Sequence, residues 1–152
     1  MKRKLFLIGA FLLLLFLVGI SQAQNITWYK GGYAQERGQK LYDWYWGSPA
    51  QELPSGNVGM GVKLYWTDAG RRSHDINPRV KFTLYTTAYN IERNQYLHYS
   101  VDHFDFNNEH VYTSDPFPFG REWKDAKPGS MAEVWIEKAA EAPRVKFDAP
   151  LI

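Results

Sequence analysis

The chain has 152 residues, of which 18 are Lys or Arg and 16 are Asp or Glu, and it contains no cysteine. Disulfides, a lipid-modified N-terminal cysteine and thiolate metal sites are therefore excluded, so packing must supply the stability. Aromatic residues make up 16% of the chain, which is dense enough for them to carry much of that packing.

The N-terminus has the three parts of a secretory leader. A basic start (Lys2, Arg3 and Lys4) precedes an apolar run from Leu5 to Ile20, and Ser21-Gln22-Ala23 ends in a small residue. Sixteen helical residues cover about 24 Å, which is short of the roughly 30 Å hydrocarbon core. We therefore expect residues 1–23 to be a signal peptide cleaved after Ala23. The expected location is extracytoplasmic (periplasm, cell surface or secreted), with membrane attachment only if the leader stays uncleaved.

Cleavage would change the charge of the protein. The leader holds three of the 18 basic residues, so 15 basic residues would remain against 16 acidic ones. The mature chain is then nearly neutral, although the pI of the whole chain is 8.7. Such a protein is not built to neutralise phosphates, and we expect no nucleic-acid partner. Residues 24–152 are enough for one domain.

Aromatic residues are concentrated near the start of the mature chain. Residues 24–30 have the composition of a short strand, which Gly31-Gly32 should end. Residues 41–46 then read LYDWYW. One interpretation is a strand that buries Tyr42, Trp44 and Trp46 on one side. In the other, a ligand-binding platform of Tyr42, Trp44, Tyr45 and Trp46 stacks on sugar rings. The sequence leaves both interpretations open.

A hairpin over Val80–Phe106 is the centre of the predicted sheet. Residues 58–66 alternate between apolar and other residues and predict a strand, and the polar residues 67–78 are expected to form a surface loop. Alternation over 80–89 and again over 97–101 then predicts two antiparallel strands joined by a polar loop.

The second strand of this hairpin has a phase problem. Leu97, Tyr99 and Val101 have one parity, whereas Phe104 and Phe106 have the other. A regular strand cannot bury both sets on one face, so we predict a β-bulge near Asp102-His103. Bulges often re-aim side chains beside functional sites, and we expect a binding role there.

Acidic and amide residues follow the expected bulge. Asp105, Asn107 and Glu109 offer the oxygen ligands that Ca²⁺ takes, although their spacing is not that of an EF-hand loop. The other interpretation is a polar turn that faces solvent. We expect no cofactor, with calcium at these three residues as the possible exception; His103 and Asp105, about 7 Å apart on a strand, could also share one transition-metal ion.

The C-terminal stretch 130–142 fits two structures. Ser130 and Glu133 have the spacing of a capping box, and Pro143 would end a helix. Against this, Ala132, Val134 and Ile136 alternate as in a strand, which the β character of the rest of the chain slightly favours. Residues 144–147 alternate again and should form the last strand.

These elements predict a mainly β, all-β fold. We expect an antiparallel β-sandwich of jelly-roll or Ig-like type over residues 24–152, with one short helix around 130–142 as an option. A small open barrel is the second choice.

Function has to be inferred from sites, and no catalytic site stands out. The sequence has no nucleophile elbow, no zinc-protease helix and no distinguished carboxylate pair. The leading hypothesis is a secreted or periplasmic, non-catalytic envelope protein that acts as a structural and protein-interaction module. Its partner would be another envelope protein or copies of itself. One alternative is a carbohydrate-binding module that holds a glycan on exposed Trp and Tyr, and another is a small extracytoplasmic hydrolase.

Overall fold

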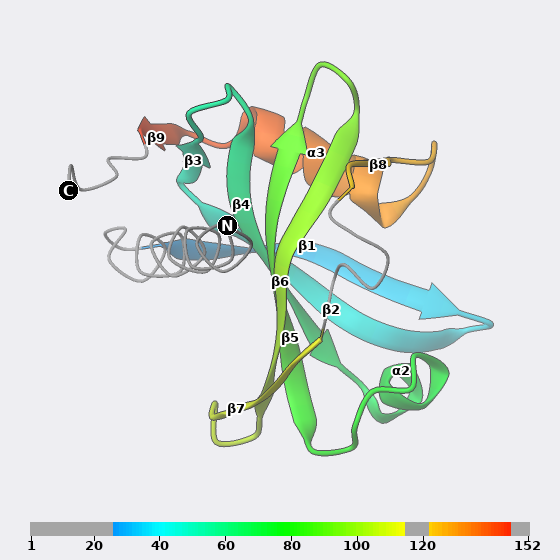
Figure 1. Cartoon of the computed structure of the whole chain (residues 1–152). Coiled ribbons are helices and arrows are strands. Elements are labelled where there is room, and N and C mark those ends of the chain that lie inside the picture. The colour runs from blue at the N-terminus through cyan, green and yellow to red at the C-terminus, as the bar shows by residue number, and fades with distance from the viewer. Residues whose placement is uncertain (1–25, 115–121, 147–152) are drawn as a thin grey trace, which may run out of the picture.

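The computed structural model describes residues 26–114 and 122–146, so the expected leader lies outside the described residues. The mainly β class is confirmed (Figure 1). Six antiparallel strands form the body of one sheet, in the order β1-β2-β4-β5-β6-β7. Their bounds are Thr27–Glu36 (β1), Gln39–Ser48 (β2), Val58–Trp66 (β4), Val80–Asn90 (β5), Gln95–Asp105 (β6) and His110–Ser114 (β7).

Three short strands and two helices complete the described part of the chain. β3 (Ala50–Glu52) pairs with β4 and, in parallel, with β9 (Arg144–Lys146), and β8 (Lys124–Asp125) pairs with β6. The helix α3 (Met131–Glu141) packs on β4, β5 and β6, while α2 (Asp68–Ser73) packs on β2 and β4 at the other end of the sheet (Figure 1).

The strands form one curled antiparallel sheet, a half-barrel. The order of its six body strands follows the chain, so successive strands pair side by side without crossing from one sheet to another. The arrangement is therefore nearer to the open barrel, our second choice, than to a two-sheet sandwich. Strand twist and several bulges supply the curl.

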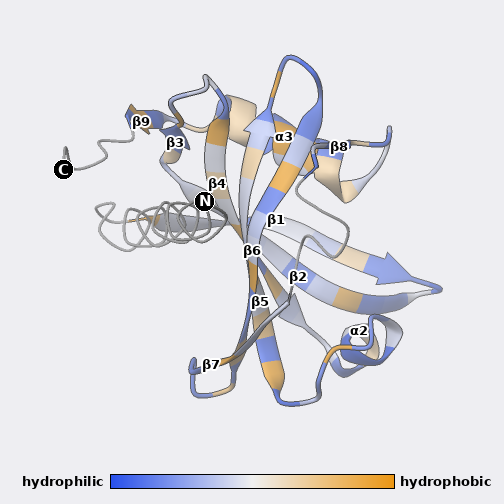
Figure 2. Cartoon of the chain, viewed as in Figure 1, coloured by the Kyte–Doolittle hydropathy of each residue, from blue (hydrophilic) through white to orange (hydrophobic). Residues whose placement is uncertain are grey.

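The core lies on the concave side of the sheet, under α3. Val58, Met60, Val62, Leu64 and Trp66 alternate along β4 and are at most 8% exposed, as the sequence pattern predicted. Trp135, Ile136 and Ala139 of α3 belong to the same apolar cluster. Figure 2 shows apolar bands on the sheet and on the helix that covers it.

The strand expected to end at Gly31-Gly32 continues to Glu36. A Cβ on Gly31 would lie 2.2 Å from the ring of Trp44, and Gly32 has a φ of +153°. The two glycines therefore form a bulge that bends β1 over Trp44. The chain reverses later, at Arg37-Gly38, where both φ angles are positive, as in the tight turn of a two-residue hairpin.

Two helices correct the expectations for their segments. The expected loop 67–78 contains α2, because Thr67 Oγ1 accepts a hydrogen bond from the N–H of Gly70 and caps the helix. The stretch 130–142 is the helix α3, so the slight preference for a strand was wrong. Ser130 Oγ accepts from the N–H of Glu133, whose carboxylate accepts from the N–H of Gly129 at 2.7 Å.

Candidate functional site

The bulge expected in β6 is present, but at Tyr99 instead of Asp102-His103. Thr86 of β5 pairs with Ser100, whereas the next residue, Thr87, pairs with His98. The phase of β6 therefore changes at Tyr99. Leu97 and Val101, which were expected on one face, lie on opposite faces of the sheet. A second irregularity, in the pairing of β6 with β7, does fall next to His103.

The Tyr99 bulge brings two histidines to the concave face. His98 and His103 are an odd number of residues apart, so a regular strand would place them on opposite faces. In the structure each lies directly opposite a threonine of β5. Thr83 Oγ1 lies 2.8 Å from His103 Nδ1, and Thr87 Oγ1 lies 2.8 Å from His98 Nδ1. We call these two cross-strand pairs the Thr–His ladder.

The Thr83–His103 pair of the ladder is part of a series of hydrogen-bonded side chains that crosses four strands. We call this series the cross-strand relay. The indole N–H of Trp66 donates to Thr83 Oγ1 at 2.8 Å, and His103 Nε2 lies 2.7 Å from Ser114 Oγ. Thr83 is fully buried and His103 is 2% exposed. An indole only donates, so Thr83 accepts from Trp66. If Thr83 gives its own hydrogen to His103 Nδ1 and His103 Nε2–H donates to Ser114, each hydrogen of the relay has an acceptor, and we adopt this order, in which His103 is neutral.

The relay contains a histidine beside a serine hydroxyl, which is the arrangement of a nucleophile and its base. A threonine stands at Nδ1 of His103, where an acid would orient such a base. The relay joins four neighbouring strands.

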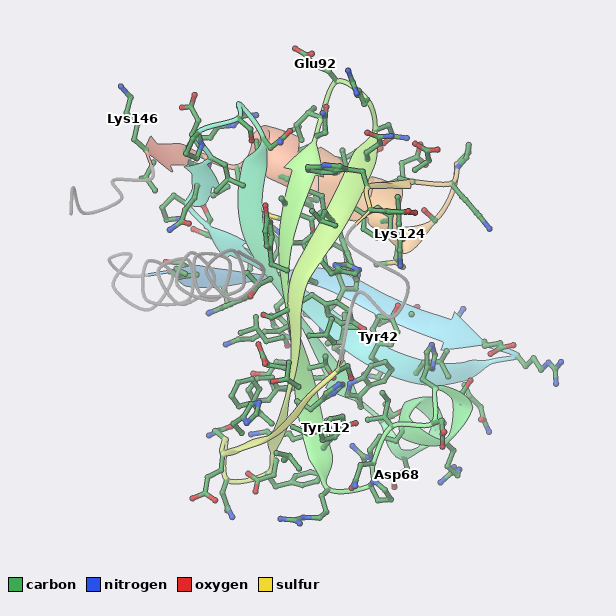
Figure 3. The ribbon with its side chains drawn as sticks, in the orientation of Figure 1. Tyr42, Asp68, Glu92, Tyr112, Lys124 and Lys146 are labelled. Carbon is green, nitrogen blue, oxygen red and sulfur yellow. The ribbon has the colours of Figure 1, made fainter. Side chains whose placement is uncertain are left out.

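The Thr87–His98 pair of the ladder lies among aromatic rings and beside an open hollow. The ring of His98 lies 5.0 Å from those of both Tyr85 and Tyr96, and 6.4 Å from that of Trp135. Burial lowers the pKa of His98 to about 4, and the nearby charge of Lys124, labelled in Figure 3, adds to this effect. The hollow, of about 390 Å³, lies next to His98 and Trp135.

The concave face also perturbs a tyrosine. Burial raises the pKa of Tyr85 to about 12, and the neighbouring hydroxyls of Tyr42 and Tyr112, both labelled in Figure 3, contribute to the rise. Tyr42 comes from β2 and Tyr112 from β7, so the curl of the sheet directs side chains from distant strands toward one interior. This interior carries neutral, hydrogen-bonding aromatic groups.

The four residues of the expected sugar platform do not share one surface. Tyr42 and Trp44 are 8% and 4% exposed and belong to the core. Trp46 is half-buried on the concave face and stacks on Tyr29, with ring centroids 5.1 Å apart. Tyr45 lies on the convex face and meets Tyr65 edge-on. Successive residues of a strand point to opposite faces, which separates Tyr45 from its neighbours.

A row of aromatic rings, which the sequence pattern does not indicate, crosses the convex face. Tyr65, Phe82 and Phe104 lie opposite one another on β4, β5 and β6, with centroids 5.1 and 4.8 Å apart. The rings of Phe82 and Phe104 are stacked, so their faces are turned toward each other. Such cross-strand pairs stabilise the sheet, and only the strand register, which the sequence does not display, brings them together.

The expected calcium ligands form a turn. Asp105 Oδ1 accepts hydrogen bonds from the backbone N–H groups of Asn107 and Glu109, at 2.8 and 3.0 Å. The carboxylate of Asp105 therefore shapes the β6–β7 turn, as aspartate does in many turns. Within residues 26–114 and 122–146, no group of three or more acidic, histidine or cysteine side chains is placed to hold a metal ion.

β1 is a long free edge of the sheet. All ten of its residues are exposed or half-exposed, with Tyr29 at 49% and Tyr33 at 57%. It pairs with β2 on one side, and no hydrogen bond between described residues occupies its other side. The opposite edge is formed by β7, which has five residues and an irregular pairing.

No protein-family model, curated protein or solved structure matches this chain. Among the helices that the structure describes, none is long and apolar enough to cross a membrane. The geometry described above leaves three features with functional potential: the β1 edge, the Thr–His ladder and the hollow beside it.

Proposed function

We propose that this chain is a non-catalytic, extracytoplasmic protein-interaction module that assembles with copies of itself through the free edge of β1. The observation that carries the proposal is the exposure of this ten-residue strand along its whole length. The leader-like residues 1–23 support the location, since such a segment directs export.

An exposed strand edge binds other strands by its backbone. It presents a row of unpaired N–H and C=O groups, which a further strand satisfies. Natural edges are usually blunted by shortness, proline or a covering segment. β7 is short, whereas β1 has ten residues and no proline, although its pairing with β2 is irregular at Gly31 and between Ala34 and Gln35. β1 is thus the edge better suited to take a partner strand.

The charges on β1 favour a second copy in antiparallel orientation. Lys30 lies in the first half of the strand and Glu36 at its end. Antiparallel self-pairing brings the half that holds Lys30 toward the half that holds Glu36, twice by symmetry, with the two side chains on opposite faces of the strand because of the Gly31 bulge. Parallel pairing would place like charges together. Lys30 remains 57% exposed although it also pairs with Asp43 at 3.2 Å, so it is available to a partner.

Sedimentation velocity on the protein purified from the extracytoplasmic fraction tests the proposal. We expect a reversible dimer, and Tyr33→Lys should weaken it at least about tenfold, or about 1.4 kcal/mol, by adding positive charge at the pairing edge. Phe106→Lys is the matched control, because Phe106 is an equally exposed aromatic residue, at 60%, outside β1. A strictly monomeric wild type, or equal weakening by both variants, would refute assembly through β1.

A further inference from the structure

His103 ties β7 to the sheet on the concave side. The strand has five residues and four residue pairs with β6. On the concave side, His103 Nε2 holds Ser114 Oγ at 2.7 Å, and the ring of Tyr112 stacks on that of His103 at 4.2 Å. One buried side chain therefore contacts both the middle and the end of β7.

The neutral state of His103 is built into this attachment. In the order that gives each hydrogen of the relay an acceptor, Nδ1 accepts the hydrogen of Thr83, whose Oγ1 accepts from Trp66. A protonated His103 would present a hydrogen at Nδ1 as well. The hydroxyl hydrogen of Thr83 would then face another donor, in a position with no exposure to water. A proton on His103 would thus add a buried charge and leave a buried donor without its acceptor.

The charged and titratable groups around His103 do not cancel this effect. Burial is the largest influence on His103 and lowers its pKa, Asp102 of the same strand raises it, and His110 of β7 lowers it. Thr83 of β5 and Trp66 of β4 complete the surroundings without a charge.

A second set of contacts ties β7 to β6 on the convex side. Thr113 Oγ1 donates to Asp102 at 2.6 Å, and His110 Nε2 lies 3.6 Å from the same carboxylate. In acid a charged His110 would strengthen this pair. Its side chain is 50% exposed, however, so water and salt screen the gain. The charge forced on buried His103 is the larger effect.

We propose that β7 is an acid-released edge strand: uptake of a proton by His103 undoes the relay and lets β7 leave β6 while the rest of the sheet stays folded. This device lies at the edge opposite β1 and does not depend on the proposed assembly. Its release would bare the edge of β6 from Val101 to Phe104, the segment that β7 covers. The release of β7 is a local unfolding event, and its free energy depends on the few contacts that hold the strand at the sheet edge.

Hydrogen exchange of the whole protein, monitored by NMR at about pH 7 and about pH 5, tests the release. Protection is expressed relative to the intrinsic exchange rate at each pH. We expect the protection of the β7 amides to fall at least about tenfold in the wild type and not in His103→Gln, while the amides of β4 and β5 change equally in the two proteins. Unchanged protection in wild-type β7, or an equal fall of β7 protection in both proteins, would overturn the proposal.

His103→Gln is the matched variant, because glutamine offers hydrogen-bonding groups but does not titrate. We expect its β7 protection to be the same at both pH values. If this variant does not fold, Ser114→Ala serves instead, since it removes only the last bond of the relay. It should lower β7 protection at about pH 7 and reduce the further loss in acid. A pH response that survives intact in either folded variant would assign the effect to another group.

Discussion

His98 and His103 share the concave face only because the bulge at Tyr99 shifts the phase of β6. Each histidine then meets a threonine directly across the strand pair and shares a hydrogen bond with it through Nδ1. Desolvation lowers the pKa of both imidazoles, and stability therefore depends on pH. The consequence is clearest for His98, whose pKa is lowered most.

Mild acid should destabilise the protein through His98. Its pKa of about 4 lies below the usual 6.5 of an unfolded chain, so the unfolded state takes up the proton first. The stabilisation is complete above pH 6.5 and is lost as the pH falls toward 4. Integrating this difference gives a loss of about 2 kcal/mol between about pH 7 and about pH 5. Urea unfolding at both pH values measures it.

The control for this effect is His98→Gln, which cannot titrate. We expect the pH-dependent loss in the variant to be smaller than in the wild type by about 2 kcal/mol. Identical pH dependence in the two proteins would show that His98 is not the group responsible.

Single residues also mark where sequence patterns stop being informative. The parity change between Val101 and Phe104 predicted a bulge between these residues, but the structure leaves them on opposite faces of the sheet, and the bulge of β6 lies at Tyr99. Its location at Tyr99 depends on which β5 residues lie opposite, and this register is set by the whole sheet. Likewise, local composition indicated that Asp105 lies in a turn, but not that its carboxylate accepts two backbone hydrogens there.

At the scale of elements, β1 and α3 show how neighbours decide between local alternatives. Gly31-Gly32 fits a turn as well as a bulge, and the ring of Trp44 beneath Gly31 decides for the bulge. Residues 130–142 carry both a strand pattern and a capping box. The helix forms because it buries Trp135, Ile136 and Ala139 on the concave face, where the sheet offers an apolar surface.

Replacing Gly31 by alanine should be costly. The added Cβ would lie 2.2 Å from the ring of Trp44, which is 4% exposed and held in the core. Relief requires β1 or Trp44 to move, and we expect a loss of about 1 to 3 kcal/mol in the free energy of unfolding. Chemical denaturation of Gly31→Ala measures this. Gln35→Ala, at an exposed position of the same strand, should cost less than about 0.5 kcal/mol, and equal costs would contradict the contact.

At the scale of the whole molecule, the open half-barrel has two unlike edges. The mainly β class and most strand positions were predictable, since alternation with a period of two is a local signal. The curling of the strands into one half-barrel was not predictable, because a sandwich and a curled sheet are built from the same strands and differ in which strands pair. The four residues of the expected sugar platform do not share one surface for a related reason: LYDWYW is one strand, and its alternate residues point to opposite faces of the sheet.

The same two edges carry the functional account. β1 offers a long exposed edge, whereas β7 covers the opposite edge and is the strand whose release we assign to His103. Assembly through β1 and release of β7 are separate claims with separate variants, Tyr33→Lys and His103→Gln. Failure of either leaves the other standing.

The central claim is that β1 pairs with β1 of a second copy, and the most direct test is amide hydrogen exchange in β1 as a function of protein concentration. Backbone N–H groups on the free side of β1 become hydrogen-bonded only in the assembly. The account predicts that protection in β1 rises with concentration in the wild type and in Phe106→Lys, and stays low in Tyr33→Lys. Protection in β1 that is independent of concentration would contradict it.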